Sequence, residues 1–177
     1  FLEECPIEDY SPLAGIYLTL TEKDFTMAST LSEFGFAMSD AGNQADYRGE
    51  GMSVSINHSE WGAPSFELTD CVKMYLQLDG EYSLIVMYYP KIDTYVFQMQ
   101  NNNRMTMNYI YDAANAGFTL NSSERESAER VITAALGETD ADDILLAPLP
   151  VFNETIKNTF GITADALYAL PFDRMTL

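Results

Sequence analysis

The sequence has almost none of the side chains from which metal sites and catalytic triads are usually built. Its 177 residues include one histidine (His58), one tryptophan (Trp61) and two cysteines (Cys5 and Cys71). A structural zinc site takes four nitrogen or sulfur ligands, more than one chain of this composition can supply. No glycine-rich phosphate loop, GxSxG turn or HExxH helix is present. We therefore predict no metal and no cofactor, and hydride, phosphoryl and zinc-hydrolase chemistries are disfavoured.

Basic residues are also scarce. Nine lysines and arginines stand against 27 aspartates and glutamates, which gives a formal net charge of −18 at pH 7. Such a charge repels phosphate backbones and anionic lipid surfaces at long range. The sequence therefore predicts no nucleic-acid partner. A solvated acidic surface explains the charge, and a surface for cations or for a basic partner is the alternative.

No apolar run is long enough for a membrane helix, which needs about 20 residues. The most apolar stretch, SLIVMYY at 83–89, has the length of a strand. The chain begins at Phe1, and its first residues resemble neither a signal peptide nor a transit peptide. We expect a mature or trimmed form, and an exported protein if a leader was removed. An extracellular, cell-surface or periplasmic location would permit a disulfide between Cys5 and Cys71. Two unbonded buried thiols fit the sequence equally well.

What the sequence does contain is the period-two pattern of half-buried strands. In MSVSIN (52–57) the apolar residues Met52, Val54 and Ile56 alternate with polar ones. Shorter versions of the pattern occur at 15–20, 24–28 and 33–38. These segments are predicted as strands of an antiparallel sheet.

Two hairpins follow. Asp79-Gly80 is typical of a two-residue turn, and such a turn sets Met74 opposite Ile85 and Val72 opposite Met87. The opposite face then carries the remaining large side chains of this hairpin, Tyr75, Tyr82, Leu84, Val86 and Tyr88.

The second predicted hairpin joins 94–100 to 104–111 through three asparagines at 101–103. A three-residue loop puts Phe97 opposite Met107, and likewise Met99 opposite Met105 and Tyr95 opposite Tyr109. This register keeps all apolar residues on one face, whereas a slip by one residue would split them.

After Gly117 the periodicity becomes helical. The segment 121–137 has the i, i+3, i+4 spacing of an amphipathic helix, with Ser122 or Ser123 as its cap and Gly137 as its end. A short helix is expected from Thr139, and two more in 152–160 and 163–170. The predicted fold is α+β, in one domain over 1–177: an antiparallel β-meander, either an open sheet or a partly closed barrel, over 1–117, then C-terminal helices over 118–177.

The stretch NHSEWGAP (57–64) is the candidate site. A histidine beside Ser59 and Glu60 supplies the atoms of a hydrolase but not the geometry, because neighbouring residues of an extended chain face opposite ways. A loop closed by Gly62 and Pro64 is the simpler interpretation. As a binding surface, Trp61 offers a flat face and one hydrogen-bond donor to a sugar ring or an apolar partner. The predicted ligand-binding residues are His58, Glu60, Trp61, Tyr75 and Tyr82.

Two carboxylate sites are alternatives. A hydrolase that acts on carbohydrate would need a pair among Glu50, Glu60 and Glu67 facing each other across a cleft. Asp140, Asp142 and Asp143 suggest calcium, but the segment lacks the glycine and distal glutamate of the helix-loop-helix motif. Helix capping by Thr139, with Asp142 at the third position, explains these acids better.

The run of about eight strands opening near LAGIY (13–17), then a helix, is similar in architecture to a lipocalin-like barrel. That resemblance implies an internal pocket for a small ligand, which the methionines and tyrosines of the sheet would line. Tyr17 stands where that family has a tryptophan. The segments TEKDFTM, GEYSLIVMYYP and LPVFNETIKNTFGIT resemble strand and helix segments of a serpin over about a fifth of the chain, without a reactive loop.

The function predicted from the sequence is that of an exported, acidic, non-enzymatic domain that binds a protein, a small molecule or a carbohydrate through its sheet or the Trp61 loop. A carboxylate hydrolase and a lipocalin-like carrier are the alternatives.

Overall fold

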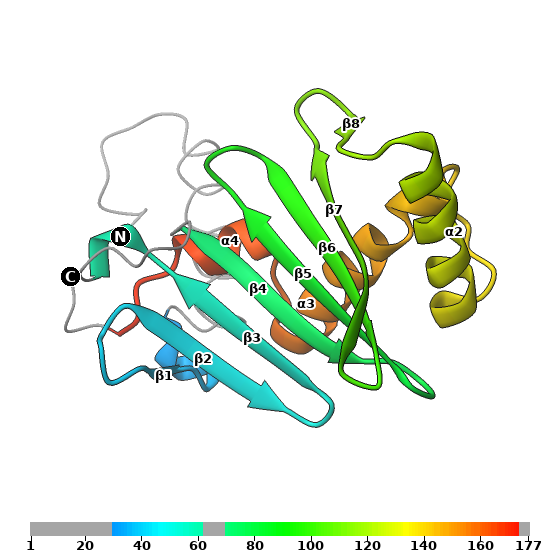
Figure 1. Ribbon diagram of the computed structural model, residues 1–177. Helices are drawn as coiled ribbons and strands as arrows, with labels where there is room; N and C mark the ends of the chain where they lie inside the picture. The colour runs from blue at the N-terminus through cyan, green and yellow to red at the C-terminus, as the bar shows by residue number, and fades with distance from the viewer. Residues whose placement is uncertain (1–29, 62–69, 174–177) are drawn as a thin grey trace, which may run out of the picture.

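The computed structural model describes residues 30–61 and 70–173. The strands predicted at 15–20 and 24–28 lie outside these residues. The described part is an eight-stranded antiparallel sheet followed by helices, so the α+β meander is confirmed (Figure 1). The strands are β1 (Ala37–Met38), β2 (Gln44–Gly49), β3 (Met52–Asn57), β4 (Cys71–Gln77), β5 (Tyr82–Tyr89), β6 (Thr94–Asn101), β7 (Arg104–Asp112) and β8 (Gly117–Phe118).

Each strand pairs with its neighbours in the sequence, and the two ends of the sheet do not meet. Within the described residues β1 pairs only with β2, and β8 only with β7. The sheet is therefore open, and the partly closed barrel is not formed. Only two of the six residues predicted as a strand over 33–38 belong to β1, because a 3-10 helix (Ser32–Phe34) and Gly35 at φ 96° precede it.

The register of the β4–β5 hairpin differs from the prediction by one residue. Val72 lies opposite Tyr88 and Met74 opposite Val86. The Leu78 N–H donates to the Tyr82 carbonyl at 2.9 Å, so three residues form the loop, with Gly80 at φ 81°. Because side chains alternate faces, this slip turns Leu84, Val86 and Tyr88 toward the core and moves Ile85 and Met87 to the other face.

The β6–β7 hairpin turns through two residues instead of the predicted three. Asn102 and Asn103 both have positive φ, 49° and 65°, as a two-residue turn requires. A bulge beside Met99 and Gln100 then shifts the pairing, so that Met99 lies opposite Met107, Phe97 opposite Tyr109 and Tyr95 opposite Tyr111. Relative to the predicted register, the pairing of β7 with β6 is displaced by two residues in total. Because side chains alternate faces, a displacement of two keeps the predicted apolar face, but it leaves Met105 48% exposed.

Three of the four predicted helices are present, and the cap of the first differs from the prediction. The first, α2 (Ser122–Leu136), is capped by Asn121 rather than by a serine: the Asn121 side chain accepts from the Glu124 N–H, and the Glu124 carboxylate accepts from the Asn121 N–H. Gly137 ends it, as predicted. In place of the helix expected from Thr139, Asp143 caps a 3-10 helix (Ile144–Leu146). The last helices are α3 (Pro148–Phe160), ended by Gly161, and α4 (Ala164–Ala169), capped by Thr163.

The core lies between one face of the sheet and the C-terminal helices. Figure 1 shows α3 and α4 behind the sheet and α2 beyond β7. Val54, Met74 and Phe97 from the sheet are fully buried, together with Phe152 and Ile156 of α3. No helix in the described ranges has the length and apolar character needed to cross a bilayer.

Two tyrosines tie the sheet to the helices through hydrogen bonds. The Tyr88 hydroxyl donates to Asp165 of α4 at 2.7 Å, and the Tyr109 hydroxyl donates to the backbone carbonyl of Leu145. Burial, with Asp165 adjacent, raises the pKa of Tyr88 above its usual value, and burial raises that of Tyr109. Both hydroxyls therefore remain protonated donors at neutral pH.

Candidate functional site

The stretch around Trp61 follows directly from the end of β3. After Asn57 the chain leaves the sheet and forms a 3-10 helix over Ser59–Trp61, in which the Trp61 N–H donates to the His58 carbonyl at 3.2 Å. The non-strand conformation predicted for this stretch is therefore found over 58–61. Gly62 and Pro64, the residues predicted to close it, lie outside the described residues.

His58 is held between two aromatic rings. Its imidazole stacks on Tyr168 of α4, with ring centroids 4.0 Å apart, and contacts Trp61 at 4.3 Å. Its Nε2 lies 2.7 Å from the backbone carbonyl of Tyr168. A carbonyl only accepts hydrogen bonds, so Nε2 carries the proton.

The imidazole is neutral at pH 7. Burial lowers the pKa of His58, and this effect exceeds the opposite influence of the Tyr168 carbonyl and of the Asp70 and Glu60 carboxylates. A neutral ring suits the stacked position, because a cation there would lose hydration.

Asp70 is the polar centre that holds this region together. Its Oδ1 accepts from the Ser59 N–H and hydroxyl, each at 3.1 Å, and from the Tyr168 hydroxyl at 2.8 Å. Its Oδ2 pairs with Lys91 at 3.0 Å. Burial alone would raise the pKa of Asp70, but these hydrogen bonds outweigh it and hold the pKa well below its usual range. One carboxylate thus joins the 3-10 helix, β4, the β5–β6 turn and α4.

These contacts leave no serine-histidine dyad. The Ser59 hydroxyl donates to Asp70, and the protonated nitrogen of His58 donates to the Tyr168 carbonyl. These groups therefore do not hydrogen-bond to each other. A general base must lie within hydrogen-bond reach of its nucleophile. The arrangement supports a role for His58 in positioning the rings of Trp61 and Tyr168.

A cavity of about 600 Å³ opens beside these rings. Trp61, Leu170 and Phe172 form apolar walls, and His58 and Glu60 supply its polar side chains. We refer to this cavity as the Trp61 hollow. The remaining lining residues are Met38, Gly42, Ala169 and Pro171. Three of the predicted ligand-binding residues, His58, Glu60 and Trp61, therefore come together in one concave site.

Tyr75 and Tyr82, the other two predicted residues, lie elsewhere. Tyr75 belongs to the face of β4 away from the helices, where it lines a separate shallow cavity of about 440 Å³ over β2 and β3. Its hydroxyl shares a hydrogen bond with Ser83 at 2.9 Å. Tyr82 begins β5 and pairs with Asn101, at the end of that strand remote from Lys91. Neither tyrosine belongs to the Trp61 hollow.

The carboxylates proposed for a hydrolase are separated by the length of a strand. Glu50 lies in the β2–β3 turn and Glu60 beyond the other end of β3, whose six residues span about 16 Å. Paired glycosidase carboxylates stand about 5–10 Å apart. Glu50 and Glu60 do not form such a pair, and Glu67 lies outside the described residues.

Of the acidic residues in the segment 140–143, Asp143 is engaged in structural contacts. Asp143 caps its 3-10 helix and binds Arg125 through both oxygens, at 2.7 and 2.8 Å. Residues 30–61 and 70–173 contain no group of three acidic, histidine or cysteine side chains that could hold a metal ion. The predicted cap, Thr139 with Asp142 at the third position, is wrong: Asp143 is the capping residue, and the Thr139 hydroxyl accepts from the Ala141 N–H at 3.1 Å without starting a helix.

Cys71 begins β4 and is 4% exposed. It lies next to Asn57 of β3, close to the chain that leads to Trp61. Cys5 is outside the described residues, so the disulfide between them stays a prediction.

No sequence pattern indicated a role for Asp70, Lys91 or Tyr168. Each is a single polar or aromatic residue without a motif around it, and Tyr168 is 110 positions from His58. The only local signal is that Asp70 stands immediately before a strand, at φ 67°, a conformation that aspartate tolerates better than most residues.

No family model matches the chain, and no curated protein or solved structure matches it. The lipocalin and serpin resemblances therefore gain no support. The geometry of the Trp61 hollow is the basis for the function proposed below.

Proposed function

We propose that this protein is a non-enzymatic binding domain that holds an apolar, positively charged group of a partner protein in the Trp61 hollow. The observation that carries this proposal is the aromatic stack of Trp61, His58 and Tyr168, which Asp70 supports through its hydrogen bonds to the Tyr168 hydroxyl and to Ser59. Preorganised sites lose less entropy on binding.

The walls and the charge of the site define its ligand. Trp61, Leu170 and Phe172 suit an apolar or aromatic group, and the exposed Glu60 suits a cation beside it. A cation near the indole face gains further attraction. The net charge of −18 would also attract a basic partner at long range.

Binding explains the contacts of this region better than catalysis does. The polar groups that a hydrolase would need, the Ser59 hydroxyl and the protonated nitrogen of His58, are already engaged in the fold. The exported location, extracellular or periplasmic, is part of the proposal and rests on the sequence alone.

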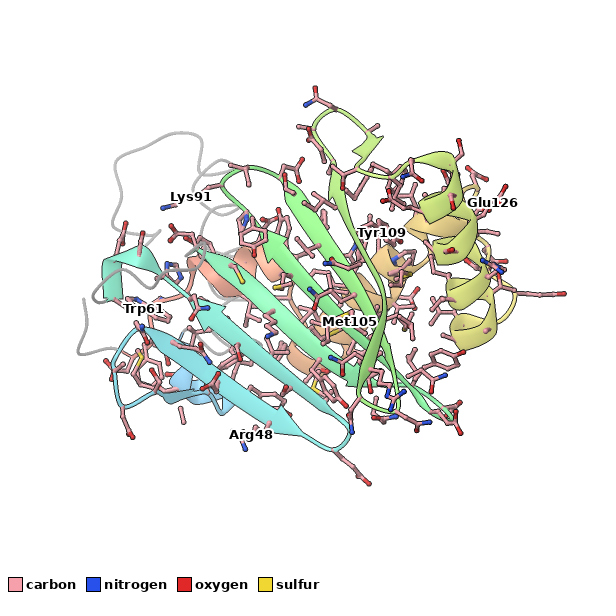
Figure 2. The ribbon with its side chains drawn as sticks, viewed as in Figure 1. Arg48, Trp61, Lys91, Met105, Tyr109 and Glu126 are labelled. Carbon is pink, nitrogen blue, oxygen red and sulfur yellow. The ribbon has the colours of Figure 1, made fainter. Side chains whose placement is uncertain are left out.

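Calorimetric titration with phenylalanyl-lysine amide tests the proposal, with a neutral oligosaccharide titrated for comparison. We expect saturable binding of the dipeptide, weakened about two- to fivefold by Glu60→Gln, since a partly exposed ion pair contributes up to about 1 kcal/mol. Glu126→Gln removes the same charge from α2, at the opposite end of the molecule from Trp61 (Figure 2), and should leave the affinity unchanged. Equal losses in both variants, or preference for the oligosaccharide, would contradict the proposal.

A further inference from the structure

The outer edge of β7 is paired for only part of its length. β8 pairs with Tyr111 and Asp112. One step further along, the Thr119 N–H donates to the Ile110 carbonyl and the Ile110 N–H donates to the Thr119 hydroxyl, both at 3.1 Å. The chain then turns away to α2, and no strand of the described residues continues the pairing along 104–108.

Asn108 presents its backbone to this open edge. Residues two apart in an antiparallel strand direct their N–H and C=O groups to the same side. Ile110 faces Thr119, so Asn108 also faces away from β6. Asn108 is exposed, and its backbone extends the row of hydrogen bonds that Thr119 begins.

A groove of about 280 Å³ runs between this edge and α2. Met107 and Ala128, 6% and 3% exposed, form its floor. Polar side chains rise on both sides, and Glu124 adds a negative charge. These polar side chains are Thr106, Asn108, Thr119, Ser123 and Ser127.

We propose that an extended, lysine- or arginine-containing segment of a partner protein binds in this groove as an additional strand on β7. An open edge supplies main-chain hydrogen bonds, and a flanking helix supplies contacts for alternate side chains. The bulge beside Met99 and Gln100 interrupts the regular edge near Thr106, so the added strand is short, about four residues or 13 Å.

The charge of the groove and of the chain selects this occupant. Glu124 and the net charge of −18 attract a basic segment and repel a second copy of the same chain. This groove lies beside α2, remote from the Trp61 hollow (Figures 1 and 2). The proposal for the groove can therefore be tested independently of ligand binding in the Trp61 hollow.

The probe is an acetylated and amidated seven-residue peptide of alternating lysine and threonine, followed by NMR of the ¹⁵N-labelled full chain. We expect saturable shifts of the Thr106 and Asn108 amides and slower hydrogen exchange at Asn108. Asn108→Pro removes the outward N–H, which an edge strand tolerates, and should weaken binding about tenfold, as expected for one hydrogen bond. Asn108→Ala keeps the N–H and should retain the affinity.

A second pair of variants approaches the groove from the helix, so that a folding defect of Asn108→Pro does not decide the result. Ser127→Tyr fills the groove and should weaken binding, whereas Thr133→Tyr, on the same helix outside the groove, should not. The proposal is wrong if both tyrosine variants bind equally, or if an alternating glutamate-threonine peptide binds as well as the lysine one. It is equally wrong if the same amides shift with protein concentration alone, which would identify a second copy as the occupant.

Discussion

At the scale of single residues, the Trp61 region depends on one carboxylate. Asp70 accepts three hydrogen bonds at one oxygen and an ion pair at the other. Removing its charge leaves the Ser59 and Tyr168 donors with a weaker acceptor. The rigidity of the Trp61 hollow therefore depends on these hydrogen bonds and this ion pair.

We expect Asp70→Asn to lower the free energy of unfolding by about 1.5–3 kcal/mol, the range for hydrogen bonds to a charged group. Asparagine keeps the size of the side chain and tolerates the positive φ of this position. Urea denaturation measures the loss. The exposed Asp140→Asn, outside this network, should cost less than about 0.5 kcal/mol, and a similar cost for both variants would contradict the role of Asp70.

The half-buried imidazole of His58 makes the free energy of unfolding depend on pH. Because burial lowers the pKa of His58 in the folded state, the unfolded chain binds a proton more readily as the pH falls below about 6.5. The contribution of His58 is thus complete above that pH and is lost during acidification toward its lower folded pKa. We expect the free energy of unfolding of the wild type to fall relative to His58→Gln between pH 7.5 and 5.

Urea denaturation of both proteins across this range isolates the histidine, since all other groups are shared. A difference that stays constant, or that changes in favour of the wild type on acidification, would contradict the assignment. Asp70 acts in a lower window: its pKa is depressed in the fold, so its contribution is present above its unfolded pKa near 4 and is lost below it.

At the scale of elements, the register of the β6–β7 hairpin can be tested against the register predicted from the sequence. With three loop residues and no bulge, Met105 and Met107 would occupy equivalent positions on the apolar face. In the structure Met107 is 6% exposed and Met105 48%. We expect Met107→Ala to cost about 2–5 kcal/mol and Met105→Ala less than about 0.5 kcal/mol, measured by thermal or urea unfolding. Comparable costs would favour the predicted register.

The elements that the sequence predicts well are those set by local chemistry. MSVSIN is β3 to the residue, because alternation against one core face fixes both its length and its orientation. Gly137 and Gly161 end their helices, and the asparagines take the positive φ values that the turn requires. These features depend on a few neighbouring residues.

Strand register and tertiary contacts were harder to predict from the sequence. One extra residue in the Asp79-Gly80 loop reversed the faces of Ile85 and Val86, and no local signal separates a two-residue from a three-residue loop there. Asn121 rather than Ser122 caps α2, since both residue types cap well and only the Glu124 contact decides. The stacking of His58 on Tyr168 depends on how α4 packs, which no pattern near either residue indicates.

At the scale of the whole molecule, the sheet is open and helices cover one of its faces, so the two proposed binding surfaces lie at its margins. The Trp61 hollow lies where β3 leaves the sheet beside α4, and the proposed peptide groove lies between the β7 edge and α2. An acidic chain with two such surfaces is suited to basic protein partners. The central claim is that the Trp61 hollow receives a cationic, apolar group.

The fluorescence of Trp61 tests this claim most directly, because the chain has one tryptophan and its emission reports on the hollow alone. During titration with phenylalanyl-lysine amide, we predict a saturable change in emission whose midpoint matches the calorimetric affinity. Binding heat without any change in the emission of Trp61, or no saturable change at all, would show that the hollow is not the binding site.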